Sequence, residues 1–93
     1  MKQDKITAEN IKKYREITQK ALDIARKSIS RGKEKEAKEI LAMAEAYISD
    51  SRHFESKSDL VSAFGAIYYA NGWLDCGARL KILDVSDANL FAI

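Results

Sequence analysis

The feature that most constrains this chain is a set of three segments in which apolar side chains recur every three or four residues. This spacing matches the 3.6 residues of an α-helical turn, so each segment predicts a helix with an apolar stripe. The 93 residues include no proline and only four glycines, so few residues can interrupt these helices. The patterns predict helices at about 7–31, 33–56 and 59–80.

The expected helices begin and end at residues suited to those positions. Thr7 can cap the first helix, since its hydroxyl can accept hydrogen bonds from amides of the first turn. Gly32 allows the left-handed backbone that often follows a last turn. Ser58 or Asp59 can cap the third helix. Short breaks make consecutive helices antiparallel, so the sequence predicts one all-α domain over residues 1–93, a three-helix up-and-down antiparallel bundle.

The third expected helix, 59–80, is apolar around most of its circumference, unlike the other two. Such a helix must be buried on most sides, either between the other helices or against a partner. The tail at 84–93 ends in apolar residues and is expected to fold back onto the bundle. If the tail leaves the third helix uncovered, a homodimer through this helix is the simplest solution, and this is the outcome that we favour. The helix carries Leu60, Val61, Ala63, Phe64, Ala66, Ile67, Tyr68, Tyr69, Ala70, Trp73 and Leu74, and the tail Leu90, Phe91 and Ile93.

The cysteine count and the terminal residues bear on the compartment. Cys76 is the only cysteine, so no disulfide can form within the chain and a reducing interior fits best. No apolar run reaches the ~20 residues of a membrane-spanning helix, and the N-terminus is polar rather than a signal segment. We therefore expect a cytoplasmic protein without a membrane partner, with Cys76 as a buried, unreactive thiol.

The C-terminal half resembles an archaeal family known as domain of unknown function 357. The residues that carry the resemblance are Ala70-Asn71-Gly72-Trp73-Leu74-Asp75-Cys76-Gly77-Ala78-Arg79-Leu80, preceded by Asp59-Leu60-Val61-Ser62-Ala63-Phe64 and followed by Ile82-Leu83-Asp84-Val85. The family pattern often has histidine at Asn71, alanine at Cys76 and commonly glycine at Lys81. The resemblance implies a compact up-and-down three-helix bundle of archaeal origin with no established activity. Any acid–base role of that histidine is excluded here, because an asparagine amide does not titrate.

Charged and aromatic residues near the end of the third helix are the candidates for a protein-interaction site. Asp75 and Arg79 are four residues apart on one helical face and flank Trp73. They form either a surface ion pair worth about 0–1 kcal/mol or part of a binding site, since Trp and Arg are enriched in hot spots. The protein-interaction candidates are Tyr69, Trp73, Asp75 and Arg79. An enzyme using Asp75, Arg79 and Asn71 is a third alternative, which requires a tight pocket around those groups.

Basic residues surround the expected turn between the first two helices. Residues 1–48 hold 12 Lys/Arg against 8 Asp/Glu, or +4, whereas residues 49–93 hold 4 against 6, or −2. Such a cluster can contact phosphates, but the interspersed Glu34 and Glu36 and the absence of aromatic residues favour a solvated face. Nucleic-acid binding through this turn is the alternative function. Its candidate residues are Arg26, Lys27, Arg31, Lys33, Lys35 and Lys38.

The sequence contains no recognisable set of catalytic residues. His53 is the only histidine and has no partner base or nucleophile near it in sequence, which favours a surface or interhelical position. Cys76 lacks the spacing of a zinc site, and Gly-rich phosphate loops, paired catalytic carboxylates and the HExxH motif are absent. No metal, nucleotide or organic cofactor is therefore predicted. The favoured interpretation is a non-enzymatic protein-interaction or scaffold domain.

Overall fold

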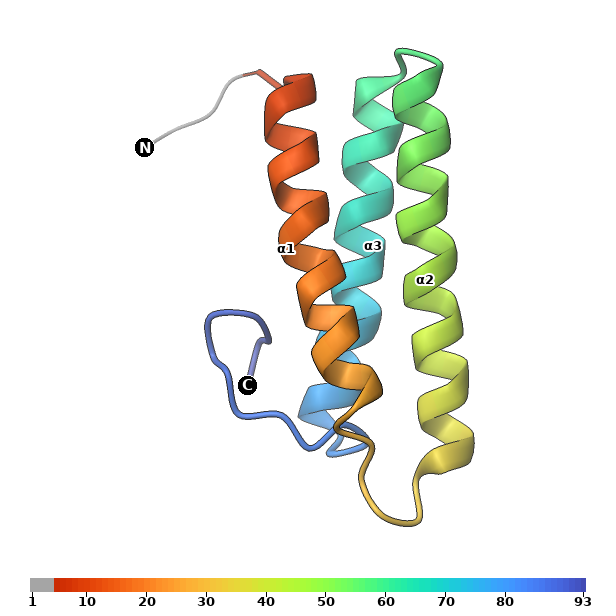
Figure 1. The fold of residues 1–93 in the computed structure, drawn as a ribbon, viewed down its shortest axis with the longest axis vertical. Coiled ribbons are helices and arrows are strands. Elements are labelled where there is room, and N and C mark those ends of the chain that lie inside the picture. The colour runs from red at the N-terminus through yellow and green to blue at the C-terminus, as the bar shows by residue number, and fades with distance from the viewer. Residues whose placement is uncertain (1–4) are drawn as a thin grey trace.

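The computed structural model describes residues 5–93, which form three long helices followed by an irregular tail (Figure 1). The helices are α1 (Ala8–Arg26), α2 (Glu34–Ser56) and α3 (Leu60–Arg79). Consecutive helices run in opposite directions along the long axis of the molecule, and each packs against the other two. The predicted all-α, up-and-down bundle is confirmed. Residues 1–4, part of the polar N-terminus noted above, lie outside the described residues.

Side-chain caps begin α1 and α3. Thr7 Oγ1 accepts a hydrogen bond from the Asn10 amide at 3.1 Å, as predicted. Asp59, one of the two predicted caps of α3, accepts from the Ser62 amide at 3.1 Å. Hydrogen bonding to Ser62 lowers the pKa of Asp59, because it favours the carboxylate over the protonated acid. Both helices therefore begin where the sequence predicts.

The end of α1 differs from the prediction. The helix stops at Arg26 rather than at residue 31, because residues 28–30 pair with residues 82–84 of the tail. Two backbone hydrogen bonds of 3.0 and 2.6 Å join these segments, and Ile29 and Leu83 form an isolated antiparallel β-bridge. The tail thus satisfies backbone groups that a longer helix would have bonded internally, so the predicted helix end is wrong.

Three residues in left-handed backbone make the turns after the helices. Gly32, predicted at such a position, has φ of +84°, whereas Ser58 and Lys81 reach +59° and +61° without being glycine. After α3, the Lys81 amide donates to the Ala78 carbonyl at 3.1 Å, and the following amide donates to the Gly77 carbonyl at 2.9 Å. This pair of bonds is a Schellman motif. The left-handed conformation costs a non-glycine residue about 1–2 kcal/mol.

The core lies between the helices and is rich in alanine, which allows close packing. The small residues Ala63, Ala66, Ala70 and Gly77 of α3 are buried, and α2 and α3 form the most extensive helix pair. A Cβ atom on Gly77 would lie only 3.0 Å from the Leu83 side chain and 3.2 Å from that of Ile40. A larger residue at this position would therefore displace these side chains. The other buried apolar residues are Ile11, Ala21, Leu22, Ala25, Ala37, Ala44, Ile48, Ile67, Leu74, Ala78 and Phe91.

Polar contacts in the upper part of the bundle also connect α1 to its neighbours. Thr18, which is fully buried, places Oγ1 3.0 Å from Asn71 Oδ1 and 3.0 Å from the Tyr14 carbonyl oxygen. Its single proton can be donated to only one of these acceptors at a time. Arg15 pairs with Glu55 of α2 at 2.6 Å. The first contact links α1 to α3 and the second links α1 to α2.

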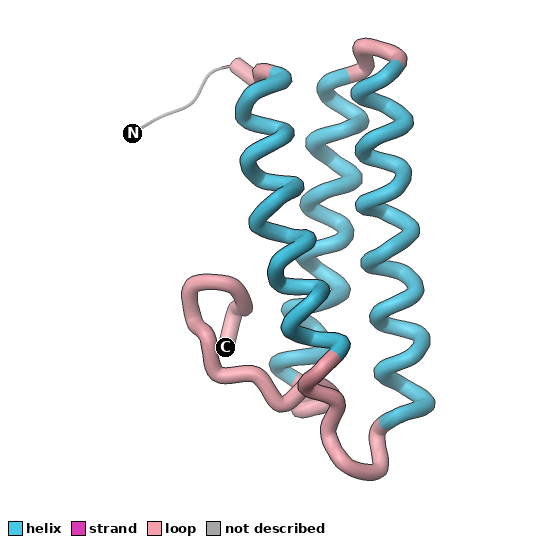
Figure 2. The backbone as a smooth tube through the Cα atoms, viewed as in Figure 1, coloured by secondary structure: helices cyan, strands magenta, loops and turns pink. Residues whose placement is uncertain are grey.

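The tail after α3 folds back beside the lower half of α1 (Figure 2). Leu83 and Phe91 are buried and Leu90 is half-buried, which confirms the expected packing of the tail onto the bundle. Ile93 is an exception and remains half exposed. The tail covers the flank of α3 next to Ile17 of α1, and leaves another side of α3 in solvent.

Candidate functional site

One side of α3 is apolar and exposed along the length of the helix. Large side chains lie in water there, with exposed fractions of 72% for Val61, 66% for Tyr68, 65% for Tyr69 and 63% for Leu80. The members of this stripe follow one another at steps of one, three and four residues, and the charged residue on this side of α3 is Arg79 in the last turn, three residues after Cys76. We call it the outer face of α3; it consists of Val61, Gly65, Tyr68, Tyr69, Gly72, Trp73, Cys76 and Leu80.

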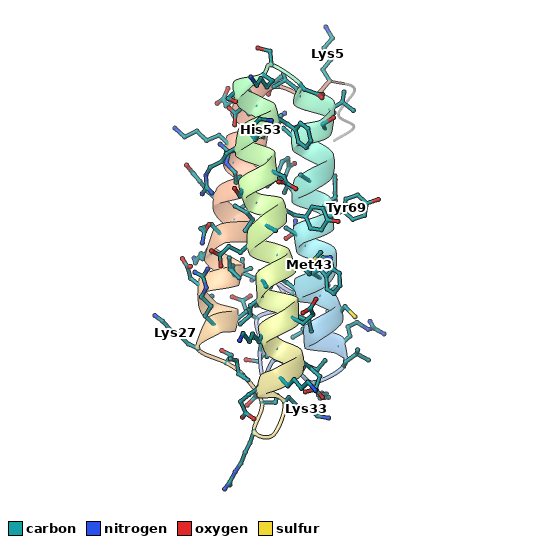
Figure 3. All side chains as sticks on the ribbon, turned by 90° about the vertical axis from the view of Figure 1, so that its right-hand side faces the viewer. Lys5, Lys27, Lys33, Met43, His53 and Tyr69 are labelled. Atoms are coloured by element: carbon teal, nitrogen blue, oxygen red, sulfur yellow. The ribbon has the colours of Figure 1, made fainter. Side chains whose placement is uncertain are left out.

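The expectation that α3 is buried on most sides is wrong for this face. Tyr69 lies on the α3 side of the molecule, away from α1 (Figure 3). A tyrosine buries about 150–250 Å² when enclosed, so Tyr68 and Tyr69 together expose roughly 200–330 Å² of surface. With Val61 and Leu80 added, the patch reaches the few hundred Å² above which exposed apolar surface marks interaction sites.

Neighbouring aromatic rings hold both tyrosines in place. Tyr69 stacks on Tyr47 of α2 with ring centroids 5.2 Å apart and planes 20° apart. Tyr68 packs against Phe64 at 4.8 Å, and Phe64 in turn contacts Tyr14 of α1 at 5.6 Å. Rings already held in one position lose little conformational freedom when another molecule binds. The two tyrosines are therefore pre-organised for contact.

Two glycines open the outer face on either side of Tyr68 and Tyr69, one turn before and one turn after them. A Cβ atom added at Gly65 or at Gly72 would meet no other atom within 4 Å. Glycine costs a helix about 1 kcal/mol relative to alanine, and packing within the chain gives no reason for that cost at either position. Beside Gly72 lies a shallow groove of about 440 Å³, whose walls are Tyr68, Tyr69, Trp73 and Cys76.

The four interaction candidates from the sequence lie on different sides of α3. Tyr69 and Trp73 belong to the outer face, whereas Asp75 lies on the tail side, where its Oδ1 accepts a hydrogen bond from the Ala92 amide at 3.0 Å. Arg79 is exposed in the last turn of the helix. The expected surface ion pair between Asp75 and Arg79 is absent from the part of the chain that the structure describes.

The residues of the enzyme alternative do not converge. Asn71 and Asp75 border a hollow beneath the tail, and Arg79 borders a different one. Asn71 is engaged by Thr18 in the core. His53 is exposed and contacts Phe54 edge-on, with ring centroids 5.8 Å apart. Between residues 5 and 93, no three side chains of His, Cys, Asp or Glu are placed to hold a metal ion.

Cys76 is exposed on the outer face, so the expectation of a buried thiol is wrong. The sequence of an almost wholly apolar helix does not indicate which of its sides the neighbouring helices cover. For this reason, the sequence pattern also failed to identify several other members of the outer face. The signal that could find them is a second stripe at helical spacing, interrupted by glycines and without charge before Arg79; the missed residues are Val61, Gly65, Tyr68, Gly72 and Leu80.

The basic residues lie around the turn between α1 and α2, at the end of the bundle where Lys27 and Lys33 are seen in Figure 3. Arg26 is engaged by two carboxylates, Asp23 at 3.3 Å and Glu45 at 2.7 Å. The remaining candidates are exposed, and none belongs to the outer face of α3; they are Lys27, Arg31, Lys33, Lys35 and Lys38.

A family model described as Protein of unknown function (DUF357) matches residues 13–83, from the second turn of α1 into the tail. The chain belongs to this family. The match includes the whole of α2 and α3, and it confirms the resemblance carried by residues 70–80. The DUF357 description assigns no activity. No curated protein and no solved structure matches the chain.

None of the helices within residues 5–93 is both long enough and apolar enough to cross a membrane.

Proposed function

We propose that this DUF357 protein is a non-enzymatic protein-interaction or scaffold domain that binds a partner through the outer face of α3. The observation that carries the proposal is the exposure of Tyr68 and Tyr69, each about two-thirds in water, on a helix face that carries no charged residue before Arg79. Covering this apolar surface is favourable by roughly 25 cal/mol per Å² of area removed from water.

The composition of the face favours protein contact over small-molecule binding. Interface hot spots are enriched in tyrosine and tryptophan, and they lie in patches that exclude water when the partner docks. Tyr69 and Trp73 lie side by side on this face, and both tyrosines are already fixed by stacking. The groove beside Gly72 is shallow and open to solvent, so it suits a protruding side chain of another protein.

Nucleic-acid binding through the turn between α1 and α2 is the alternative. Five exposed basic residues around that turn support it. The pairing of Arg26 with Asp23 and Glu45 weakens it, because that charge is already compensated. Glu34 weakens it further, since its carboxylate lies in the turn and accepts a hydrogen bond from the Gly32 amide at 3.1 Å.

A capture experiment with matched variants tests the proposal. Wild-type protein, a Tyr69→Glu variant and a Ser49→Glu variant are immobilised, and proteins retained from native lysate are identified by mass spectrometry. Ser49 is exposed on α2 and lies outside the outer face, so its variant carries the same new charge elsewhere. We expect one partner to be retained by wild type and by Ser49→Glu, and lost with Tyr69→Glu.

Two results would overturn the proposal. One is a set of retained proteins that does not change when Tyr69 is replaced. The other is salt-dependent binding to RNA or DNA that disappears in a variant with Arg31, Lys33 and Lys35 changed to glutamate, which would establish the alternative.

The proposal also places the protein in the cytoplasm of an archaeal cell. The exposed Cys76 thiol supports a reducing compartment, because an accessible free thiol in an oxidising one is prone to mixed disulfides. Localising the tagged protein by fractionation checks this placement.

A further inference from the structure

We infer that the outer face of α3 binds a second copy of this chain, with the two α3 helices antiparallel across a twofold axis. The inference rests on the proposed function and names its partner. Four observations carry it: the spacing of the face, the sizes of its side chains, the charges at its two ends and its area.

The spacing of the outer face is symmetric about the midpoint between Ala70 and Asn71. Its members lie at residues 61, 65, 68, 69, 72, 73, 76 and 80, and the steps between them read the same in both directions. Two copies that cross antiparallel at this midpoint therefore bring every member of one face opposite a member of the other.

This register also matches large side chains to small ones. Tyr69 of each copy faces Gly72 of the other, where a Cβ atom would meet no side chain within 4 Å. Gly65 faces Cys76, so the helices meet through small residues on both sides of the axis. The two glycines, which packing within one chain leaves unexplained, thus allow the close approach of the second helix.

The large residues that have no glycine opposite them pair with each other. Tyr68 faces Trp73 of the second copy, and Val61 faces its Leu80. These contacts cover three of the four most exposed large apolar residues of the helix, Val61, Tyr68 and Leu80. A parallel arrangement in equal register would instead stack each tyrosine against its own equivalent and leave the glycines facing each other.

The charges at the two ends of α3 fit the antiparallel arrangement. Asp59 caps the beginning of the helix, and Asp50 borders the hollow beside it. Arg79 and Lys81 lie at the end of the helix. In the proposed register, the basic end of one copy lies within a turn of the acidic end of the other, so opposite charges meet; Lys57 offsets part of the acidic charge.

The area of the face predicts a weak dimer. Tyr68 and Tyr69 contribute roughly 200–330 Å² per copy, and the remaining members bring the total toward the lower end of specific interfaces, below about 1,200 Å² for both copies. We therefore expect a dissociation constant in the micromolar range, and light scattering should show the mass rising with concentration.

Cross-linking through cysteine tests the register. A Gly65→Cys variant places a second thiol opposite Cys76 of the other copy, and its Cβ atom meets no side chain within 4 Å in the monomer. Within one chain these thiols are eleven residues apart, or about 16 Å along the helix, too far for a disulfide. We expect mild oxidation of Gly65→Cys to give a covalent dimer, whereas wild type and a Gly65→Cys, Cys76→Ser variant remain monomeric on denaturing gels.

The outcomes separate the inference from the proposed function. A covalent dimer of wild type through Cys76 alone would indicate a different register and overturn the inference. Absence of cross-linking in Gly65→Cys, together with a monomer mass at high concentration, would also overturn it. In that case the capture experiment still decides the proposed function, since a different protein can occupy the same face.

A Gly72→Ala variant provides a second, independent measurement. In the monomer the new methyl group meets nothing within 4 Å, so the melting temperature at low concentration should rise. In the dimer it occupies the space taken by Tyr69 of the second copy, so the dissociation constant should increase by about tenfold or more. Equal dimer affinity in Gly72→Ala and wild type would contradict the proposed contact.

Discussion

Replacing Lys81 with glycine should stabilise the protein, although glycine usually weakens a helix. Lys81 is exposed and has φ of +61° in the turn that ends α3. Removing the left-handed strain of lysine should raise the free energy of unfolding by about 1–2 kcal/mol. Glycine has more conformational freedom in the unfolded chain, which lowers the free energy of unfolding by about 0.5–1 kcal/mol. From the middle of both ranges the net gain is about 0.75 kcal/mol, or roughly 3–6 °C in melting temperature for a domain of this size.

Urea unfolding followed by circular dichroism measures this gain, and the slope of free energy against urea should not change. Arg79→Gly is the matched control, because Arg79 lies two residues earlier with helical backbone. Glycine there should cost about 1 kcal/mol. If Lys81→Gly destabilises the protein as much as Arg79→Gly does, the turn does not hold residue 81 in the left-handed region and the reasoning fails.

Three further changes test the core, the polar contact and the cap of α3. Leu74→Ala should lower the free energy of unfolding by about 2–5 kcal/mol because it empties a buried site, and a loss of under about 1 kcal/mol would contradict the assigned core. The double variant Thr18→Val, Asn71→Ala should lower the free energy of unfolding by less than the sum of the two single variants, which a double-mutant cycle measures. Strict additivity would mean that the two side chains do not interact. The Asp59 carboxylate, whose pKa is lowered in the folded protein, stabilises the fold fully above its ordinary pKa of 3.8 and ceases to do so as pH falls through the lowered pKa. In Asp59→Ala the free energy of unfolding should therefore fall less steeply as the solution is acidified. An acid unfolding curve that keeps its shape would argue against this role.

The fold could be predicted from the sequence because its determinants are local. Apolar residues at helical spacing define each helix, and Thr7, Gly32 and Asp59 mark boundaries through backbone chemistry that acts within a few residues. The end of α1 could not be predicted this way. Residues 28–30 leave the helix because they pair with residues 82–84, a contact between segments far apart in the sequence.

The candidate site was predictable only in part, for a related reason. Tyr69 and Trp73 stand out by residue type alone. Asp75 also stands out, as the expected partner of Arg79, but its carboxylate instead accepts a hydrogen bond from the Ala92 amide of the tail. The exposure of Cys76 depends on which side of α3 the neighbouring helices cover. The periodicity of apolar residues cannot predict this side, because α3 is apolar on nearly every side.

The bridge between Ile29 and Leu83 has a consequence for the order in which the molecule folds and opens. α2 and α3 are joined by a short turn and pack most extensively, so their contacts form early and at low loop-closure cost. The bridge closes a much longer loop and rests on two backbone hydrogen bonds. We therefore expect the tail to dock last and to detach first, and the amide hydrogens of Ser30 and Asp84 to exchange with solvent through local opening, well before those in the middle of α2.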